Sequence, residues 1–211
     1  MKVMVYHKDY DGILQSLLEN PGLANEGWSL HDHSTHIAHP LHRICDGVFL
    51  NYYGDEEAAR MASIFLNHGA LVNGNNPPPG TDTPLIAAAS LHADKVALLY
   101  IAHGADIAHP GTHGGTALHW AAWCGRPVVV EALLKAGAQV GTLCSDFRST
   151  PLFWAVHGSK NHTSSDEHAR CVELLLKAGA DKTYPNKDGN TVFDLLDNAD
   201  DVMRDLLNRQ Y

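Results

Sequence analysis

Gly115-Thr-Ala-Leu-His-Trp-Ala-Ala-Trp-Cys-Gly125, continued by Pro127-Val-Val-Val-Glu-Ala-Leu-Leu-Lys-Ala-Gly-Ala138, predicts a short helix, a tight turn, a second helix and a glycine stop. The small pair Ala121-Ala122 lets a neighbouring helix approach closely. The apolar pair Leu133-Leu134 supplies an inward face for the second helix. Gly137 can adopt the left-handed conformation that ends a helix.

The same design recurs on both sides of this stretch. Thr-Pro-Leu stands at residues 83–85 and again at 150–152, and Thr116 lies 33 residues after Thr83 and 34 before Thr150. Gly-Ala pairs close segments at residues 69–70, 104–105, 137–138 and 179–180. A period near 33 residues with a Thr-Pro-Leu-His-x-Ala spelling is the signature of ankyrin repeats, and the chain resembles that family.

The repeated residue types each have a physical role. Threonine suits a helix N-cap because its hydroxyl accepts a hydrogen bond from the first turn. Pro84 and Pro151 then occupy the first helical position, where no N–H is missed. Four residues before each Gly-Ala stands an apolar pair, which we expect to face inward; the pairs are Phe65-Leu66, Tyr100-Ile101, Leu133-Leu134 and Leu175-Leu176.

The resemblance implies an all-α ankyrin-repeat solenoid, since one such unit cannot bury its apolar face alone and must stack on its neighbours. We expect residues 1–211 to form a single ankyrin-repeat domain of about six helix-turn-helix units with finger loops. The divergent first and last units are expected to be caps. The approximate units are 1–25, 35–73, 81–108, 114–140, 148–183 and 187–211.

Four segments depart from the regular repeat. Residues 26–38 predict a long linker or finger, and 74–80 have the Gly, Asn and Pro composition of a turn. The second unit carries about nine extra residues, which we assign to 49–54, either as lengthened helices or as a bulge. The fifth unit carries about eight, which we assign to a polar, flexible loop at 158–166, and insertions in repeat proteins often mark the binding face.

Composition narrows the function class. The formal net charge is −9 and basic runs are absent from the sequence, which argues against unspecific binding to nucleic acid or to membranes. No stretch is long and apolar enough to span a bilayer, and the first ten residues lack a signal-peptide pattern. The four cysteines include no Cys-x-x-Cys, so we expect reduced thiols and a cytoplasmic protein. No cofactor is expected.

The resemblance also implies where a partner would bind. Ankyrin proteins usually bind another protein on the concave side, through fingers and through late positions of each first helix. By position, we predict a partner-binding set of Asp82, Ser90, Leu91, His113, Trp123, Cys124, Phe147 and His157. Exposed aromatics are typical anchors of protein interfaces, so we expect Phe147 to be exposed, whereas Trp123 fits either an anchor or partial packing. Trp120 and Trp154 are expected to be core residues.

Fifteen histidines make the chain histidine-rich, and protonating all of them would move the formal charge from −9 to +6. This suggests an alternative function as a metal- or pH-responsive regulator. His31, Asp32, His33, His36, His39 and His42 form a cluster whose imidazoles and carboxylate are of the kinds that bind zinc or nickel. However, Pro40 would interrupt a shared helix, and the cluster lacks the fixed spacings of zinc sites. His42 and His119 match the histidine that the family uses to tie its loops.

Enzyme motifs are absent from the sequence: it has no Gly-x-Ser-x-Gly, no phosphate-binding loop and no His-Glu-x-x-His. Cys124 and His157 fall on neighbouring repeats and could in principle be a nucleophile and a base. Nothing in the pattern orients them or supplies oxyanion donors. We therefore predict a non-catalytic protein-protein interaction scaffold.

Overall fold

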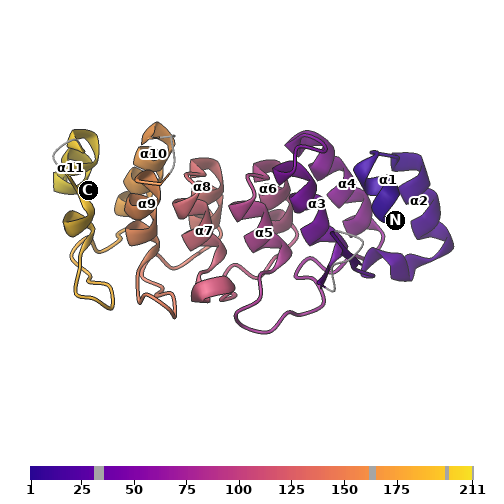
Figure 1. Ribbon diagram of the computed structural model, residues 1–211, viewed down its shortest axis with the longest axis horizontal. Helices are drawn as coiled ribbons and strands as arrows, with labels where there is room; N and C mark the ends of the chain where they lie inside the picture. Colours follow the sequence, from indigo (N-terminus) through magenta and orange to yellow (C-terminus); the bar gives the residue numbers. More distant parts are fainter. Residues whose placement is uncertain (31–35, 162–164, 198–199, 211) are drawn as a thin grey trace. The chain divides into compact units, whose positions relative to one another are not determined.

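The computed structural model describes residues 1–30, 36–161, 165–197 and 200–210. It is built of paired helices joined by loops (Figure 1). The chain divides into two compact units: unit 1 comprises residues 1–78 and 82–106, and unit 2 comprises 79–81 and 107–211. Within the described residues, no helix is long and apolar enough to cross a membrane.

Unit 1 contains three helix pairs and a short hairpin. Its elements are α1 (Lys2–Tyr6), α2 (Tyr10–Glu19), the 3₁₀ helix η1 (Pro21–Ala24), β1 (Trp28–Ser29), β2 (Ile37–Ala38), α3 (Pro40–Phe49), α4 (Asp55–Asn67), α5 (Pro84–Ser90) and α6 (Asp94–Ala102). The helices pack in order, α3 against α5 and α4 against α6. The fully buried Tyr100 joins two pairs, because its hydroxyl donates to the carbonyl of Leu41 at 2.8 Å.

The antiparallel hairpin of β1 and β2 pairs Trp28 with Ala38. Buried Arg43 of α3 fixes its position: Nε donates to the carbonyl of Trp28 at 2.8 Å, and Nη2 donates to that of His36 at 2.8 Å. The same guanidinium pairs with Asp46 at 2.7 Å. A buried charge is tolerated only when it is paired and hydrogen-bonded, so this network ties the finger predicted at 26–38 to the second helix pair.

Unit 2 contains two complete helix pairs and a final partial one. Its elements are η2 (Thr112–Gly114), α7 (Ala117–Trp123), α8 (Pro127–Lys135), α9 (Pro151–Ser159), α10 (Ser165–Lys177), η3 (Val192–Leu195) and α11 (Asp201–Asn208). Helix α7 packs against α9, α8 against α10, and α10 against α11. Each pair therefore covers the apolar face of the pair before it.

The predicted caps form at the starts of the helices. The Thr83 hydroxyl accepts from Ile86 N–H, and that of Thr150 accepts from Phe153 N–H, both at 3.3 Å. Thr116 instead forms a reciprocal box with His119. At the ends of the second helices, Gly104 and Gly137 have φ values of +75° and +95°, the left-handed conformation expected there.

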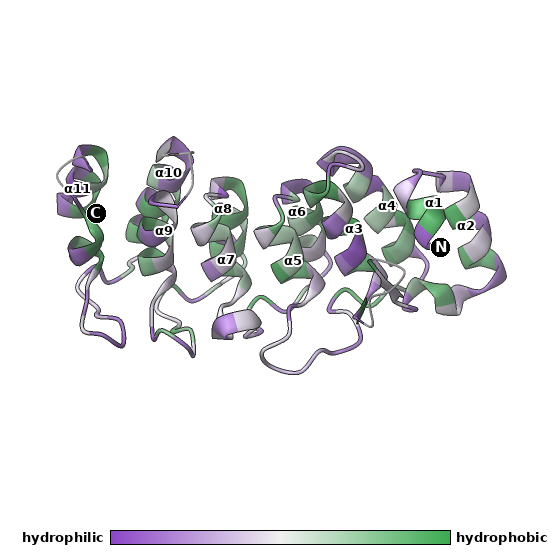
Figure 2. Ribbon diagram, in the orientation of Figure 1, coloured by the Kyte–Doolittle hydropathy of each residue, from purple (hydrophilic) through white to green (hydrophobic). Residues whose placement is uncertain are grey.

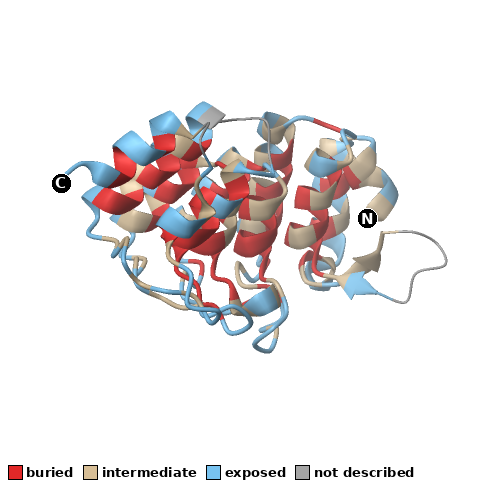
Figure 3. Cartoon of the chain, turned by 60° about the vertical axis from the view of Figure 1, so that its left-hand side comes forward, coloured by how far each residue is buried: buried red, intermediate tan, exposed pale blue. Residues whose placement is uncertain are grey.

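The apolar pairs before these glycines divide their roles. The first member of every pair is fully buried, as Phe65, Tyr100, Leu133 and Leu175 show. The second member is partly exposed in three of the pairs and buried in the fourth. Figure 2 shows hydrophobic residues concentrated in the helices, and Figure 3 shows the buried residues on the faces that helices of one unit turn toward each other.

The extra residues of the second pair lengthen its helices. Helices α3 and α4 have 10 and 13 residues, whereas α5 and α6 have 7 and 9. The extra residues of the fifth repeat also lengthen its helices, because α9 runs to Ser159 and α10 begins at Ser165. Residues 158–159 and 165–166 of the segment predicted as a loop are therefore helical, and residues 162–164 lie outside the described residues.

Candidate binding site

Backbone hydrogen bonds align the three finger loops of unit 2, which are the loops that contain His113, Phe147 and Lys187. Asp146 N–H donates to the carbonyl of His113 at 3.3 Å, and Lys187 N–H donates to that of Phe147 at 2.9 Å. Each finger is thus hydrogen-bonded to the next. The side chains of successive fingers are held side by side, next to the first helices that follow them.

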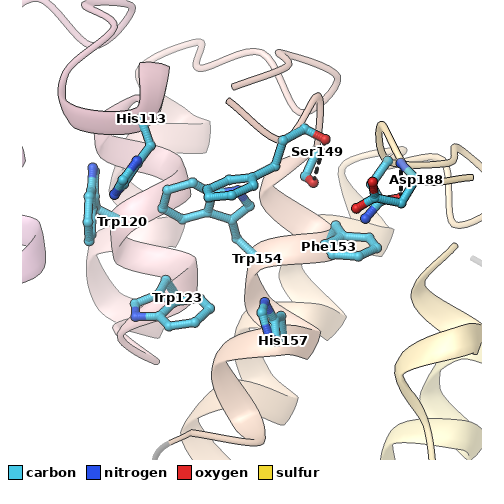
Figure 4. Close-up of a pocket in the computed structure, with 10 residues that line it drawn as sticks. His113, Trp120, Trp123, Ser149, Phe153, Trp154, His157 and Asp188 are labelled. Carbon is cyan, nitrogen blue, oxygen red and sulfur yellow. Dashed lines mark hydrogen bonds between the residues drawn. The ribbon is translucent and has the colours of Figure 1, made fainter. Parts of the chain in front are cut away.

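A hollow of about 360 Å³ lies between these fingers and the helices α7 and α9. We call it the aromatic hollow, because five large aromatic side chains line it: Trp120, Trp123, Phe147, Phe153 and Trp154. Two histidines, His113 and His157, and the polar residues Ser149, Asn186 and Asp188 complete the lining. Figure 4 shows the rings gathered around Trp154, with Asp188 beyond Phe153.

Trp154 is the centre of the ring cluster. Its ring centroid lies 5.2 Å from that of Trp120 and 6.0 Å from that of Trp123, with interplanar angles of 81° and 73°. The Phe147 centroid is 6.5 Å away at 61°. Edge-to-face contacts of this kind add about 0.5–1.5 kcal/mol each beyond area burial. They hold the rings of Trp120, Trp123 and Phe147 at steep angles to Trp154.

The end of α7 is fixed from two sides. His168 of α10 is bonded through Nε2 to the carbonyl of Trp123 at 2.9 Å. Gly158 of α9 comes so close that a Cβ on it would lie 2.2 Å from the same oxygen. Trp123 therefore has a fixed backbone, and its ring lies 5.1 Å from the His157 ring at 82°.

Polar groups surround the rings. His113, in the left-handed conformation at φ +59°, bonds through Nδ1 to the Asp146 carboxylate at 2.8 Å. This bond is the main cause of the lowered pKa of Asp146. Lys187 places its ammonium 5.0 Å from the centre of the Phe147 ring while donating to the carbonyl of Asp146. The surface around the hollow thus combines ring faces, carboxylates and one ammonium.

Four of the residues predicted for partner binding line this one hollow: His113, Trp123, Phe147 and His157. Phe147 is 40% exposed and Trp123 is half-buried. Three others, Asp82, Ser90 and Leu91, belong to unit 1 and are each partly exposed. Cys124 departs from its predicted surface position, because as the C-cap of α7 it is turned inward and only 8% exposed.

Part of the lining differs from what the sequence predicts. Trp120 was expected in the core, but it is half-buried and lines the hollow; Trp154 is buried as expected, and its ring nevertheless forms part of the wall. A signal was present, since Trp120 and Trp154 are 34 residues apart, which is one repeat. Residues one period apart lie side by side in stacked repeats. Phe153 occupies the place that His119 has one repeat earlier.

The histidine cluster has structural roles where it is described. His36 precedes β2, His39 is the N-cap of α3, and His42 lies in the first turn of α3, so they do not share one helix. Within the described part of the chain, no group of three or more His, Cys, Asp or Glu could hold a metal ion. His31, Asp32 and His33 lie outside the described residues.

Burial keeps several histidines neutral. It lowers the pKa of His39 and of His119 to about 4 and lowers that of His42 as well. His119 accepts from Thr116 N–H and donates to the carbonyl of Ser149 at 3.2 Å, so it ties the finger to the helix as the family resemblance implied. A folded chain near pH 5 therefore keeps His39 and His119 neutral and carries less positive charge than protonation of every histidine would give.

Burial also affects the protonation of the cysteine thiols. All four are buried thiols rather than disulfides, and burial raises the pKa of Cys124 to about 11. A thiol with this pKa remains protonated near neutral pH, whereas the thiolate is the nucleophile. Cys124 thus lacks the activation that a catalytic cysteine needs.

The repeat geometry agrees with the comparison to known families. The family model for ankyrin repeats (3 copies) matches residues 52–144 and again 112–186, which together cover more than half of the chain. The chain belongs to the ankyrin-repeat family. The predicted all-α ankyrin fold is confirmed, and ankyrin repeats are a non-catalytic, protein-binding fold.

Similar proteins carry the same repeats within longer chains. Human palmitoyltransferase ZDHHC13 is 36% identical over 86 residues, covering 41% of this chain and 12% of its own length. The E3 ubiquitin-protein ligase KEG of Arabidopsis thaliana is 30% identical over 139 residues, covering 63% and 8%. The putative palmitoyltransferase ZDHHC13 of Danio rerio is 28% identical over 133 residues, covering 58% and 19%. The chain thus spans less than a fifth of each relative.

Proposed function

We propose that this chain is a non-catalytic scaffold that binds a partner protein through the aromatic hollow and the fingers of unit 2. The observation that carries this proposal is a set of large rings lining an open hollow, including the 40% exposed Phe147. Aromatic side chains that remain accessible contribute most of the binding energy in many protein interfaces.

The fingers support the same function. Their backbone bonds fix Phe147 and His113 before any partner arrives, and a preorganised surface loses less conformational entropy on binding. Trp123 is likewise fixed by His168. Affinity would come from Trp123 and Phe147, while His113, His157 and Asp188 would orient the partner through hydrogen bonds and charge.

We also infer a cytoplasmic setting. The four cysteines are thiols rather than disulfides, and reduced thiols are typical of the cytosol.

The test compares partner capture by three variants. Trp123→Ala and Phe147→Ala remove rings from the hollow, whereas Val128→Ala removes an apolar side chain of α8 that is 46% exposed. We expect proteins captured from native cell extract by the wild type to be lost with both aromatic variants and kept with Val128→Ala. With a purified partner, each aromatic variant should bind at least about thirtyfold more weakly, the effect of a hot spot of about 2 kcal/mol.

Cooperative urea unfolding of every variant is the folding control. If a captured protein binds all four chains equally, the assignment of the aromatic hollow as the binding surface is wrong.

A further inference from the structure

The walls of the aromatic hollow suit a cation. The face of an aromatic ring carries partial negative charge, and cations lie over the faces of Trp, Tyr and Phe. Trp154 meets two rings of the preceding repeat at steep angles, with its centroid 5.2 Å from that of Trp120 and 6.0 Å from that of Trp123. Rings set at steep angles around one space can present several faces to a single guest. Aromatic cages that recognise quaternary ammonium groups are built from such rings lining one space.

The molecule already places a cation on one of these rings. The ammonium of Lys187 lies 5.0 Å from the centre of the Phe147 ring. Its N–H groups require acceptors, and one is met by the carbonyl of Asp146 at 2.8 Å. The unmodified ammonium of Lys187 is therefore held beside the Phe147 ring with a backbone oxygen as its acceptor.

Charge around the hollow is complementary to a cation. The carboxylate of Asp188 lines it, and the lining residue His113 is bonded to a second carboxylate, that of Asp146. Lys187 is the opposing charge described above. The chain as a whole carries a formal net charge of −9. The net charge of the chain therefore attracts an incoming cation.

The polar lining distinguishes between kinds of cation. An unmodified lysine ammonium brings three N–H donors. Ser149 Oγ donates to the carbonyl of Phe147, and Asn186 Oδ1 already accepts from the N–H groups of Asp188 and Asn190. Besides the imidazoles of His113 and His157, the Asp188 carboxylate is thus the main acceptor left among the polar side chains that line the hollow. A methylated ammonium keeps its charge and needs fewer acceptors, so it fits these walls better.

We propose that the aromatic hollow binds a methylated lysine side chain of the partner protein, with Trp120, Trp123 and Trp154 around the methylammonium and Asp188 as its counter-charge. This inference rests on the proposed protein-binding function. A lysine on a polypeptide suits a volume of about 360 Å³ better than a small free amine, because its aliphatic stem also covers ring surface. The neighbouring fingers are then available to the peptide backbone.

Indole N–H signals in two-dimensional ¹H–¹⁵N NMR spectra give a direct test. The chain has four tryptophans, of which Trp28 lies in unit 1 and serves as an internal reference. The probes are capped pentapeptides of glycine with a central lysine that is unmodified, trimethylated or replaced by its neutral tert-butyl isostere. We expect the trimethylated probe to shift the signals of Trp120, Trp123 and Trp154 and to leave that of Trp28 in place.

The trimethylated probe should bind at least tenfold more tightly than either of the other two. If the neutral isostere binds as tightly as the trimethylated probe, the hollow does not recognise the positive charge. If the unmodified probe binds as tightly or more tightly, methylation is not required. Free choline that binds as tightly as the trimethylated peptide would overturn the lysine source.

Two variants localise the effect. Trp123→Ala should weaken binding of the trimethylated probe at least tenfold, and Asp188→Asn about threefold. The matched control is Asp205→Asn, an exposed carboxylate on α11, which should leave binding unchanged. If no probe binds although Trp123→Ala still abolishes partner capture, the methylated-lysine ligand is wrong and the protein-binding function stands.

Discussion

Repeat three in unit 1 and repeats four and five in unit 2 share a helix framework but differ in what they display. Their first helices align on Thr83, Thr116 and Thr150. Two positions later each carries a leucine that is at most 1% exposed. Four positions later, repeat three has Ala87, whereas the other two have Trp120 and Trp154. Seven positions later it has Ser90, whereas the others have Trp123 and His157.

This comparison separates fold from function. The threonines and leucines recur because every repeat needs the same helix cap and the same buried contact with a neighbouring repeat. The aromatic residues of repeats four and five are absent from the matching positions of repeat three, so the helix framework shared by the repeats does not require them. In unit 2 these aromatic side chains line the hollow. Replacing them one at a time tests what they contribute beyond the framework that the repeats share.

The largest effect is expected from Trp154→Ala, which gives repeat five the residue type of Ala87. Trp154 is 6% exposed and contacts the rings of Trp120, Trp123, His119 and Phe147. Removing a buried tryptophan should lower the free energy of unfolding by about 3–5 kcal/mol, through lost burial and the cavity left behind. Urea denaturation followed by circular dichroism measures this. A loss below about 1 kcal/mol would show that the ring is not part of the core.

The framework could be predicted from the sequence because it is local and repeated. Thr83 and Thr150 predicted their own caps, and the glycines predicted the helix ends, since each needs only neighbours within one turn. The site was only partly predictable. The place of the partner-binding set in the repeat predicted that its residues would lie on one face, and four of them line the aromatic hollow: His113, Trp123, Phe147 and His157.

The remaining site features depend on contacts between repeats. Cys124 is buried because the α7 terminus packs under its neighbours, and Asp188 reaches the hollow from a finger that follows α10 by ten residues. Neither contact follows from a residue's position within its own repeat. The lengthened α9 also depends on such a contact, since Gly158 must pass the carbonyl of Trp123.

A second difference between repeats concerns the cap of the first helix. Repeat two has His39 where repeat three has Thr83. His39 accepts from Leu41 N–H through Nδ1 at 3.3 Å and donates through Nε2 to Asn25 at 2.9 Å. Burial lowers its pKa from 6.5 to about 4. Protonation of Nδ1 would remove the acceptor for Leu41, so this cap is sensitive to acid in a way that a threonine cap is not.

The sign of the pH effect follows from that pKa. Below pH 6.5 the unfolded chain binds a proton at His39 that the folded chain does not bind until about pH 4. Stability therefore falls as the pH drops from 6.5 to 4, by about 3 kcal/mol for this residue. His39→Thr should reduce the acid-induced loss by that amount. Urea unfolding at a series of pH values measures this loss of stability. The control is pH 7.5, at which His39 is neutral in both the folded and the unfolded chain.

An unchanged slope of unfolding free energy against pH in His39→Thr would contradict this assignment. His119, whose pKa is also lowered to about 4, should supply a similar acid-induced loss that survives in the variant. The two caps can thus be separated by their contributions.

The smallest of the three effects concerns the eighth position after the aligned threonine, where repeats three and four have Leu91 and Cys124 and repeat five has Gly158. A Cβ at Gly158 would lie 2.2 Å from the carbonyl oxygen of Trp123, a backbone atom that cannot rotate away. Gly158→Ala should therefore force α7 and α9 apart and cost about 1–3 kcal/mol. Its neighbour Ser159, whose hydroxyl donates to the carbonyl of Val156, provides the matched control Ser159→Ala.

Gly158→Ala should also move the indole signal of Trp123 in the NMR spectrum, because it displaces the backbone that positions this ring. Ser159→Ala should leave that signal in place and change the free energy of unfolding by less than about 1 kcal/mol, since it removes only one partly exposed hydrogen bond. A stable Gly158→Ala with an unmoved Trp123 signal would mean that α9 does not need glycine to pass α7. The close approach of these two helices would then not be what fixes the aromatic hollow.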